Sequence, residues 1–499
     1  MVEPGIAGCD TTTGIPQGTP TPLYPHVSGP ASERPLASGR WWGSVSFLGE
    51  MEIGNPNAAA YITPDPITAR ITNKGVRMMG LPSGIRVLGN DFLYQIPDPF
   101  SEVMDGMAIA NSQYTNLDAT LYDFSDGTVT VSWKSGDVEV MRGTFVHGSP
   151  YVYFDVLAGD MVLRTLRADG GEKGTFYAQN NSLGVWTSVA GNTNYFLVTG
   201  DAGTVFDAVE SNGIRINSTT GGMTVALLPT ATPPSNAMII EHAQLARNVV
   251  HAVQVQYEVD HSQQQVLVSH QYVDANAQPV TTMTGMQPLH WKHAQVREPA
   301  YSRRSARGVT QFHVGTGFSY TLPFVGVLPT LPAINNDLEL NVVTQHINDF
   351  IALGEAQWND GREDAYWSGK NYGKVAELIA LADELALTAQ RDQLLTWLKA
   401  ELTDWFTAAS DDGLDEQQYF AYDATWDTLF AMEESFASHQ QLNDHHFHYG
   451  YLVRAAAEVC RFDASWCSES QYGPMIELLI RDYAGGREDD MFPYLRPQI

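Results

Sequence analysis

The stretch "LNDHHFHYGY", at residues 442–451, concentrates side chains that can transfer protons. It combines one carboxylate, Asp444, with three histidines and two tyrosines. A helix that begins near Asn443 places Asp444, His448 and Tyr451 on one face, because residues four and seven apart are neighbours there. A carboxyl group one turn from a histidine can act as a positioned proton donor. The spacing therefore predicts acid–base chemistry at Asp444.

Two other interpretations of the same residues stay open. His445 and His448 share a helix face and could bind zinc, but the sequence shows no third ligand. Alternatively, Asn443 or Asp444 caps the helix and the histidines are hydrogen-bonded inside the core. Four titratable groups within five residues favour chemistry over a cap alone. We expect neither a metal nor another cofactor.

The segment "YFAYDATWDTLFAMEESFAS", at residues 419–438, interleaves aromatic rings with carboxylates. Tyr422, Asp423 and Trp426 are its central residues. Aromatic faces pack on the C–H faces of sugars, and carboxylates accept hydrogen bonds from sugar hydroxyls. For each ring taken singly, ordinary core packing is at least as good an explanation. Because the cluster directly precedes the histidine-rich stretch, it favours a carbohydrate-binding cleft.

Two adjacent residues later in the chain, Arg481 and Asp482, point to different faces of the helix predicted for "YGPMIELLIRDYAG". Each therefore needs a partner of its own. Cys460 and Cys467 lie seven residues apart. They form either a local disulfide, which requires an oxidising compartment, or two partly buried free thiols.

Composition excludes several classes of function. The chain has 28 Lys and Arg against 57 Asp and Glu, a formal net charge of −29, so it repels nucleic acids and anionic membrane surfaces. No apolar run is long enough to span a bilayer, and the N-terminus lacks the basic start and apolar core of a secretory signal. The signatures of zincin proteases, P-loop enzymes, α/β-hydrolases and thioredoxin-type redox proteins are absent from the sequence.

The pattern of apolar residues divides the 499-residue chain into three parts. Residues 1–245 are predicted to form an extended leader and a large β-sandwich, as the alternation in "GTVTVSWKSGDVEV" shows for one hairpin with one buried face. Residues 246–335 mix short strands with proline-broken segments and are predicted to form a small mixed linker domain. Residues 336–499 have helical periodicity, and the helix from about 443 to 459 should be buried on all sides.

These segments resemble a known family. "YDATW", "SFASHQQLNDHHFHYGYLVRAAAEV", "YGPMIELLIRDYAGGREDDMFPYLR" and "DAYWSGK" are similar to the catalytic domain of family 81 glycoside hydrolases, which are endo-β-1,3-glucanases. "RPLASGRWWGSV" and "GVLPTLP" resemble other parts of that family, so the similarity covers nearly the whole chain. The resemblance implies a β-sandwich, a small middle domain and a C-terminal (α/α)6 barrel. It also implies secretion and a metal-free inverting reaction on β-1,3-glucan.

The resemblance further implies roles for individual residues. Asp444 matches the general acid, and His448 matches a residue that lines the cleft. Tyr422, Asp423 and Trp426 match a stretch near the substrate. Tyr366 and Lys370, in "DAYWSGK", fall at the start of a helix on the cleft side.

The sequence departs from the family after "FPYLR". Inversion needs a second carboxyl group, roughly 6.5–9.5 Å from the acid, that activates water. The family's base glutamate lies in a segment that this chain does not contain, and no motif supports Glu433, Glu434, Asp423 or Asp482 as a replacement. We therefore expect an incomplete barrel that exposes apolar helices and favours self-association. Two alternatives to hydrolysis stay open: a non-catalytic β-1,3-glucan-binding protein, and an inactive fragment.

Overall fold

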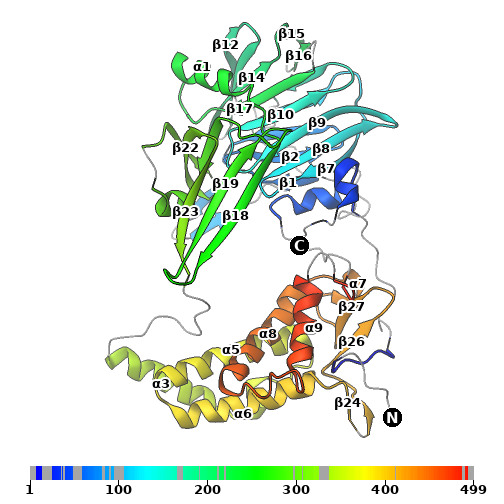
Figure 1. Ribbon diagram of the computed structural model, residues 1–499, viewed down its shortest axis with the longest axis vertical. Coiled ribbons are helices and arrows are strands. Elements are labelled where there is room, and N and C mark those ends of the chain that lie inside the picture. Colours follow the sequence, from blue (N-terminus) through cyan, green and yellow to red (C-terminus); the bar gives the residue numbers. More distant parts are fainter. Residues whose placement is uncertain are drawn as a thin grey trace. The chain divides into compact units, whose positions relative to one another are not determined.

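The structure is a computed structural model that describes most of residues 7–492 (Figure 1). The described ranges leave out residues 14–24, 35, 37–39, 49–58, 81–84, 89–90, 95–105, 166–171, 190–191, 211–212, 218–220, 296–297, 306, 325–336, 411 and 486–488. Two compact units make up the chain. A β-rich unit comprises residues 23–36 and 40–325, and a largely helical unit comprises residues 1–22, 37–39 and 326–499.

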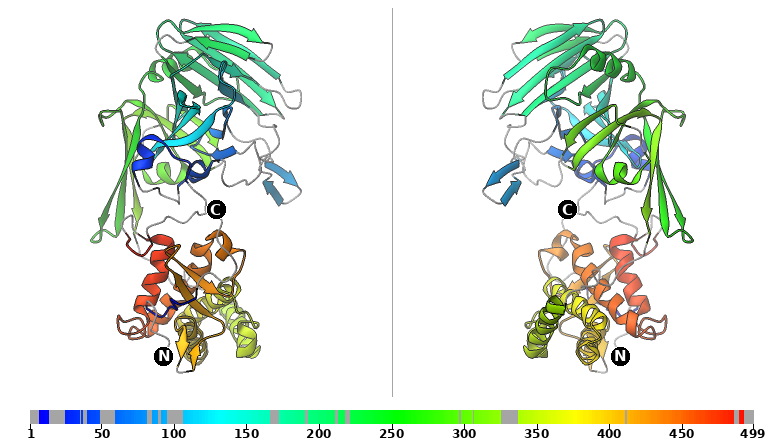
Figure 2. Two further views of the ribbon diagram at one scale, coloured as in Figure 1. Left: turned by 90° about the vertical axis from the view of Figure 1, so that its right-hand side faces the viewer. Right: turned by 90° about the vertical axis from the view of Figure 1, so that its left-hand side faces the viewer.

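Two antiparallel sheets form the bulk of the β-rich unit (Figure 2). In spatial order, the first contains β1 (Ala59–Ile62), β2 (Thr68–Thr72), β3 (Gly75–Met79), β6 (Met107–Asn111), β11 (Met161–Arg164), β16 (Gly213–Asn217) and β15 (Val205–Glu210). The second contains β12 (Glu172–Gln179), β13 (Ser182–Val189), β14 (Asn192–Gly200), β17 (Gly222–Leu227), β10 (Tyr151–Val156), β9 (Val138–Val146), β8 (Thr128–Ser135) and β7 (Asp118–Phe124). A separate hairpin joins β4 (Ile85–Leu88) to β5 (Asp91–Tyr94). One apolar core draws on residues from both large sheets, as in a sandwich.

The hairpin predicted from "GTVTVSWKSGDVEV" is present as β8 and β9. Val129, Val131 and Trp133 are fully buried, as their alternation predicts. The prediction of a single buried face is wrong, because Thr128 and Thr130 on the other face are buried as well. The chain beyond the sandwich covers this second face: the Thr128 hydroxyl donates a hydrogen bond to the His251 carbonyl at 3.2 Å.

Residues 236–323 form two small sheets and two helices in the same unit. One sheet has the order β18 (Ala252–Asp260), β19 (Gln265–Val273), β23 (Gly317–Pro323), and the other β20 (Thr282–Met286), β22 (Gly308–Gly315), β21 (Tyr301–Ser305). The helices are α1 (Asn236–Leu245) and α2 (Pro288–His293). Their apolar residues share a core with the second large sheet. The division of the chain into three domains stays a prediction.

The helical unit contains seven α-helices among its described residues. They are α3 (Asp337–Ala352), α4 (Glu355–Trp358), α5 (Ala365–Glu384), α6 (Thr388–Trp405), α7 (Ser438–Gln441), α8 (His445–Phe462) and α9 (Gly473–Ala484). Two short hairpins, β24 (Ala409–Ser410) with β25 (Gly413–Leu414) and β26 (Tyr419–Asp423) with β27 (Thr428–Met432), lie between α6 and α7 in the chain. Figure 1 shows α5, α6 and α8 running side by side. None of the helices described is long and apolar enough to cross a membrane.

The helical periodicity locates the core of this unit. Val375 and Ile379 on α5 and Leu394, Leu398 and Leu402 on α6 are all completely buried. The expectation that α8 is buried on all sides is wrong. Ala457 is exposed, and the Arg454 side chain forms a 3.0 Å ion pair with Glu377 on α5, so one side of α8 faces solvent.

The N-terminal segment adds a strand-like edge to the β26–β27 hairpin. The Asp10 amide donates to the Phe420 carbonyl at 2.9 Å, and the Tyr422 amide donates to the Asp10 carbonyl at 2.8 Å. Cys9 is buried beside these bonds. This packing explains why residues 7–13 group with the helical unit. Residues 1–6 and 14–22 of the predicted leader, the "GVLPTLP" segment and residues 493–499 lie outside the described part of the chain.

Gly8 is placed where only glycine fits. A Cβ at this position would lie 1.9 Å from the Phe406 carbonyl oxygen, which is backbone and cannot move aside. We expect Gly8→Ala to lower the stability of the helical unit by about 1–3 kcal/mol, measured by urea unfolding. The matched control is Gly450→Ala within α8, where a Cβ meets nothing within 4 Å; it should be neutral or stabilising. Equal effects of the two substitutions would contradict this account of the N-terminal segment.

Of the two states left open for Cys460 and Cys467, the structure has the disulfide. Their Cα atoms are 5.6 Å apart and the sulfurs are bonded. The bond ties the last turn of α8 to the loop that leads into α9. Disulfides of this kind persist in oxidising compartments.

Candidate functional site

The first turn of α8 places Asp444 at a helix start without using its carboxylate as a cap. Asp444 occupies the N-cap position, and its carbonyl accepts hydrogen bonds from the Phe447 amide at 2.9 Å and the His448 amide at 3.0 Å. Its side chain makes no capping hydrogen bond. The half-buried carboxylate of Asp444 therefore does not cap α8, as the purely structural interpretation of this stretch would require.

The backbone around Asp444 is unusual. Asp444 has φ of 59°, and Leu442, Phe436 and Ala437 also have positive φ, at 48°, 53° and 57°. Non-glycine residues adopt this conformation rarely, because it costs energy that the surrounding packing must supply. Such residues gather at functional sites more often than elsewhere. Their concentration within nine residues marks this segment as the candidate site.

His448 lies one turn after Asp444 and is buried. Burial is the main cause that lowers the pKa of His448 to about 4, and the neighbouring His445 lowers it further, while Asp444 and Asp364 oppose the shift. His448 is therefore a neutral imidazole near neutral pH, able to donate one hydrogen bond and accept another. The His448 ring lies 5.3 Å from the ring of Tyr366, measured between centroids.

Three rings form what we call the aromatic patch: Tyr366, Trp367 and Phe436. The Tyr366 ring lies 4.6 Å from Phe436 and 5.1 Å from Trp367. Trp367 is 39% exposed and Phe436 57% exposed, unlike the buried rings of the core. The Lys370 ammonium lies 4.9 Å from the Trp367 ring centroid and 5.2 Å from that of Tyr366. The structure thus brings Tyr366, Lys370 and His448 together beside exposed aromatic surface.

Local sequence explains why α5 presents these rings. Asp364 caps the helix by accepting hydrogen bonds from the amides of Tyr366 and Trp367, at 3.1 and 2.9 Å. The buried face of the first turns carries the small residues Ser368 and Gly369. A Cβ at Gly369 would lie 2.9 Å from the Tyr451 side chain, so glycine permits close approach of α5 to α8.

The other predicted residues lie on the β26–β27 hairpin. The Asp423 carboxylate accepts hydrogen bonds from the amides of Thr425 and Trp426, at 2.8 and 3.0 Å, and so builds the turn. Tyr422 is buried, and its hydroxyl donates to the Met491 carbonyl at 2.8 Å. Their contacts in the structure are structural, and a role in binding substrate stays a prediction for Tyr422, Asp423 and Trp426.

Most of the alternative carboxylates are engaged in structural bonds. Glu434 accepts a hydrogen bond from the His439 amide at 2.9 Å. Asp482 is completely buried and pairs with His445. Glu433 is exposed at the end of β27. Within the described residues, no group of three or more His, Cys, Asp or Glu side chains is arranged to hold a metal ion.

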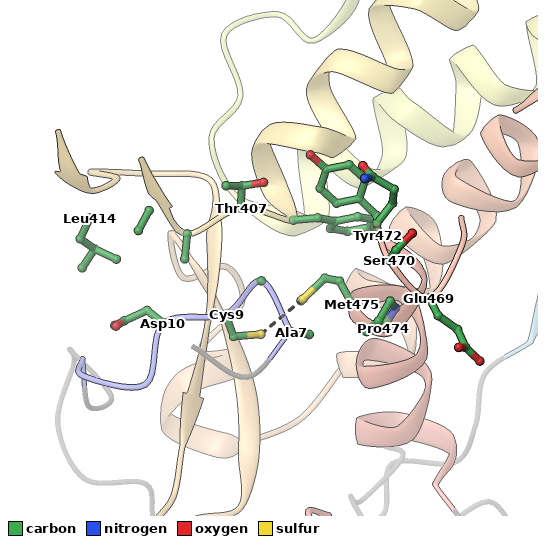
Figure 3. Close-up of a pocket in the computed structure, with 15 residues that line it drawn as sticks. Ala7, Cys9, Asp10, Thr407, Leu414, Glu469, Ser470, Tyr472, Pro474 and Met475 are labelled. Carbon is green, nitrogen blue, oxygen red and sulfur yellow. Dashed lines mark hydrogen bonds between the residues drawn. The ribbon is translucent and has the colours of Figure 1, made fainter. Parts of the chain in front are cut away.

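A separate cavity of about 440 Å³ lies at the N-terminal end of α9 (Figure 3). Asp482 lies near the other end of this helix. Residues 7–10 line the cavity together with Tyr472 and Met475. Met475 is seven residues before Asp482 on α9, roughly 10 Å along the helix. Burial raises the pKa of the Cys9 thiol far above its usual value, and the thiol contacts the Met475 sulfur at 3.4 Å. This cavity therefore presents no reactive thiolate, and the chemistry-bearing groups remain those around Asp444.

Sequence reasoning missed three features of the site. Trp367 is adjacent to Tyr366 in the quoted "DAYWSGK" and could have been found as its neighbour. Phe436 lies 4.6 Å from Tyr366 and has a left-handed backbone conformation, and nothing in the local sequence indicates either feature. The bond between His445 and Asp482 joins residues 37 positions apart; the sequence showed only that Asp482 needed a partner.

Comparisons with known proteins agree with the sequence resemblance. Residues 339–497 match the profile of the glycosyl hydrolase family 81 C-terminal domain. A glucan endo-1,3-β-D-glucosidase of Thermobifida fusca is 30% identical over 99% of this chain, and one of Acetivibrio thermocellus is 28% identical over 77%. The matches span 61% and 48% of those two proteins. A family 81 glycoside hydrolase structure from Clostridium thermocellum matches 97% of this chain and 64% of its own, with a TM-score of 0.71 and 23% identity, which shows a shared fold.

Proposed function

We propose that this chain, whose residues 339–497 match the C-terminal domain of glycosyl hydrolase family 81, takes part in endo-hydrolysis of β-1,3-glucosidic bonds in β-1,3-glucan. The proposed mechanism is inverting, with Asp444 as the general acid. The observation that carries the proposal is an Asp444 carboxylate that makes no capping bond and lies one turn from His448, whose ring is 5.3 Å from Tyr366 of the aromatic patch. The relatives from Thermobifida and Acetivibrio support the substrate class, because both are named glucan endo-1,3-β-D-glucosidases.

In this proposal each group has a physical role. Asp444 gives its proton to the glycosidic oxygen as the C–O bond breaks, while water attacks the anomeric carbon from the opposite face and gives its proton to the second carboxylate. His448, neutral near pH 7, hydrogen-bonds to a sugar hydroxyl or to the carboxyl group itself. The aromatic patch packs against the C–H face of a glucose ring, and Lys370 donates to hydroxyl oxygens.

The second carboxylate of the reaction is not assigned among the described residues. Asp423, Glu434 and Asp482 are held in structural hydrogen bonds. We propose that α5, α6, α8 and α9 form part of an (α/α)6-type barrel that presents the acid. We also propose an extracellular location, which the Cys460–Cys467 disulfide supports.

The test is hydrolysis measured across linkage types. The chain is incubated with laminarin, with a soluble β-1,4-glucan and with a β-1,6-glucan, and reducing ends are counted. We expect a carboxylate still to be assigned to activate the water, and therefore release from laminarin alone, as a mixture of oligosaccharides whose new reducing ends are first seen by NMR as α-anomers. Binding of laminarin without release would instead support a non-catalytic glucan-binding protein. No binding of laminarin would overturn the proposed substrate.

Removing one ring of the aromatic patch is expected to weaken binding of a β-1,3-linked hexasaccharide. Trp367→Ala should lower the affinity about tenfold, because an exposed aromatic contact contributes roughly 1–2 kcal/mol. Isothermal titration calorimetry measures the dissociation constant. The matched control is Tyr257→Ala on β18, which removes a ring that is 71% exposed in the β-rich unit. An unchanged affinity in Trp367→Ala would remove the patch from the binding site.

A further inference from the structure

The fully buried carboxylate of Asp482 on α9 joins β27 to the first turn of α8, which directly follows Asp444. One of its oxygens accepts hydrogen bonds from the Thr428 hydroxyl at 2.9 Å and from the Leu429 amide at 3.1 Å, both on β27. The other oxygen pairs with Nδ1 of His445, the first residue of α8. The exposed fractions of the two side chains are 0% for Asp482 and 1% for His445. A carboxylate with this burial and three partners is strongly held in place.

The same junction is fixed from a second direction. The Tyr449 ring, one turn further along α8, lies 4.6 Å from the His445 ring. The Tyr449 hydroxyl donates to the Leu429 carbonyl at 2.9 Å. Leu429 therefore has its amide held by α9 and its carbonyl held by α8. The start of α8 is therefore anchored to β27 in two ways: through Asp482, which bonds to both His445 and Leu429, and through the Tyr449 hydroxyl.

The pairing also bears on which nitrogen of His445 carries the proton. With Asp482 ionised, its carboxylate only accepts hydrogen bonds, and Nδ1 of His445 is then the donor. In the neutral ring Nε2 is then an acceptor. This nitrogen is buried and has no hydrogen-bond partner among the described residues. A buried acceptor without a partner is uncommon, and it lies on the residue that directly follows Asp444.

We propose that Asp482 is a positioning residue for the acid: through His445 it holds the first turn of α8 against β27 and so sets where the Asp444 carboxyl group lies. The inference rests on the proposed function of Asp444. The left-handed backbone of Asp444, with φ of 59°, needs such support, because its own side chain makes no capping bond. A displacement of about 1 Å at a reacting group can lower a rate about 100-fold, so the anchor matters for the chemistry.

The test compares Asp482→Asn with Glu458→Gln. Asparagine keeps the shape of Asp482 but presents a neutral amide to His445. Glu458 is the matched control because it is also a buried carboxylate, 2% exposed, and it pairs with Arg461 near the far end of α8. Both variants are checked for folding by thermal unfolding, so that a loss of stability common to both is separated from an effect on the site.

Two readouts decide the outcome. NMR with labelled histidine and aspartate should show a strongly downfield Nδ1 proton of His445 that is lost in Asp482→Asn and kept in Glu458→Gln. The 13Cα and 13Cβ shifts of Asp444 should move away from left-handed values in Asp482→Asn only. On laminarin, Asp482→Asn should lower kcat at least tenfold with KM within about threefold, and Glu458→Gln should leave both within about twofold.

The results separate this inference from the proposed function. Unchanged Asp444 shifts in a folded Asp482→Asn variant would overturn the positioning role whether or not the chain hydrolyses laminarin. An unchanged kcat in Asp482→Asn, alongside a large loss in Asp444→Asn, would overturn it while leaving the acid in place. If Asp444→Asn itself has no effect, the proposed acid is wrong, and the Asp444 shifts alone then decide whether Asp482 controls that backbone.

Discussion

Replacing Asp444 by asparagine is expected to slow laminarin hydrolysis by about 10²–10⁴-fold, because the amide has no proton to give to the glycosidic oxygen. The substitution keeps the size of the side chain. The Asp444 side chain makes no capping hydrogen bond, so its loss should leave α8 intact. Binding of a β-1,3-linked hexasaccharide should therefore stay within about threefold of the unsubstituted chain. Reducing-end release and calorimetry together give the rate and the affinity.

A matched control separates loss of the acid from loss of negative charge. Asp404 is an exposed carboxylate near the end of α6, outside the candidate site. Asp404→Asn removes the same charge and should leave the rate within about twofold. A rate for Asp444→Asn within threefold of the unsubstituted chain would show that another group protonates the leaving oxygen. A large loss of both rate and affinity would instead give Asp444 a binding role.

Much of the helical unit could be predicted because burial repeats with the helical period. Val375 and Ile379 on α5, and Leu394 and Leu398 on α6, are buried where the spacing places them. The expectation for α8 failed for a reason that spacing cannot reveal. Alanine satisfies both a buried and an exposed position, so "AAAEV" did not show that Ala457 faces solvent.

Residue spacing alone could predict the candidate site only where its residues are close in sequence, and Tyr366 and Lys370 were expected there from the family resemblance. Asp444 and His448 lie one turn apart, and a helical spacing was enough to place them together. Phe436 and Asp444 have left-handed backbone conformations. Neither is a glycine or an asparagine, the residues that usually indicate this conformation in a sequence. The sequence indicated that Arg481 and Asp482 need separate partners, and the structure supplies Asp489 for the first and His445 for the second. Which partner each would find depends on packing between elements, which only the fold determines.

Acidification from about pH 6.5 to pH 4 is expected to destabilise the β-rich unit through a group of histidines. Burial is the main cause that lowers the pKa of His147, His270 and His290 to about 4. Arg307 lowers that of His147 further, and Asp126 opposes the shift of His270. The rings pack on aromatic partners, with 4.9 Å between the centroids of His290 and Tyr320.

The sign follows from proton binding. In the unfolded chain a histidine has a pKa near 6.5, so between about pH 4 and pH 6.5 the unfolded state holds more protons than the folded state. The free energy of unfolding then falls as the pH falls. The stability that these histidines contribute is fully present above about pH 6.5 and is lost as the pH falls towards 4. A shift of this size corresponds to about 3 kcal/mol for a fully buried ring. Solvent reaches these half-buried rings, so about 1–2 kcal/mol each is the expected loss.

Two variants in one helix test this assignment. His290→Gln replaces a ring of the group with a side chain that never becomes charged, and His293→Gln does the same at an exposed position of α2. Hydrogen exchange of β19 and β23 peptides, measured at pH 7, 5.5 and 4.5 after correction for the intrinsic rates, reports the stability of the region. His290→Gln should lose part of the decline in protection towards pH 4.5, and His293→Gln should keep all of it. If both variants lose protection with the same pH dependence as the unsubstituted chain, His290 does not titrate with folding and the acid sensitivity lies in other groups.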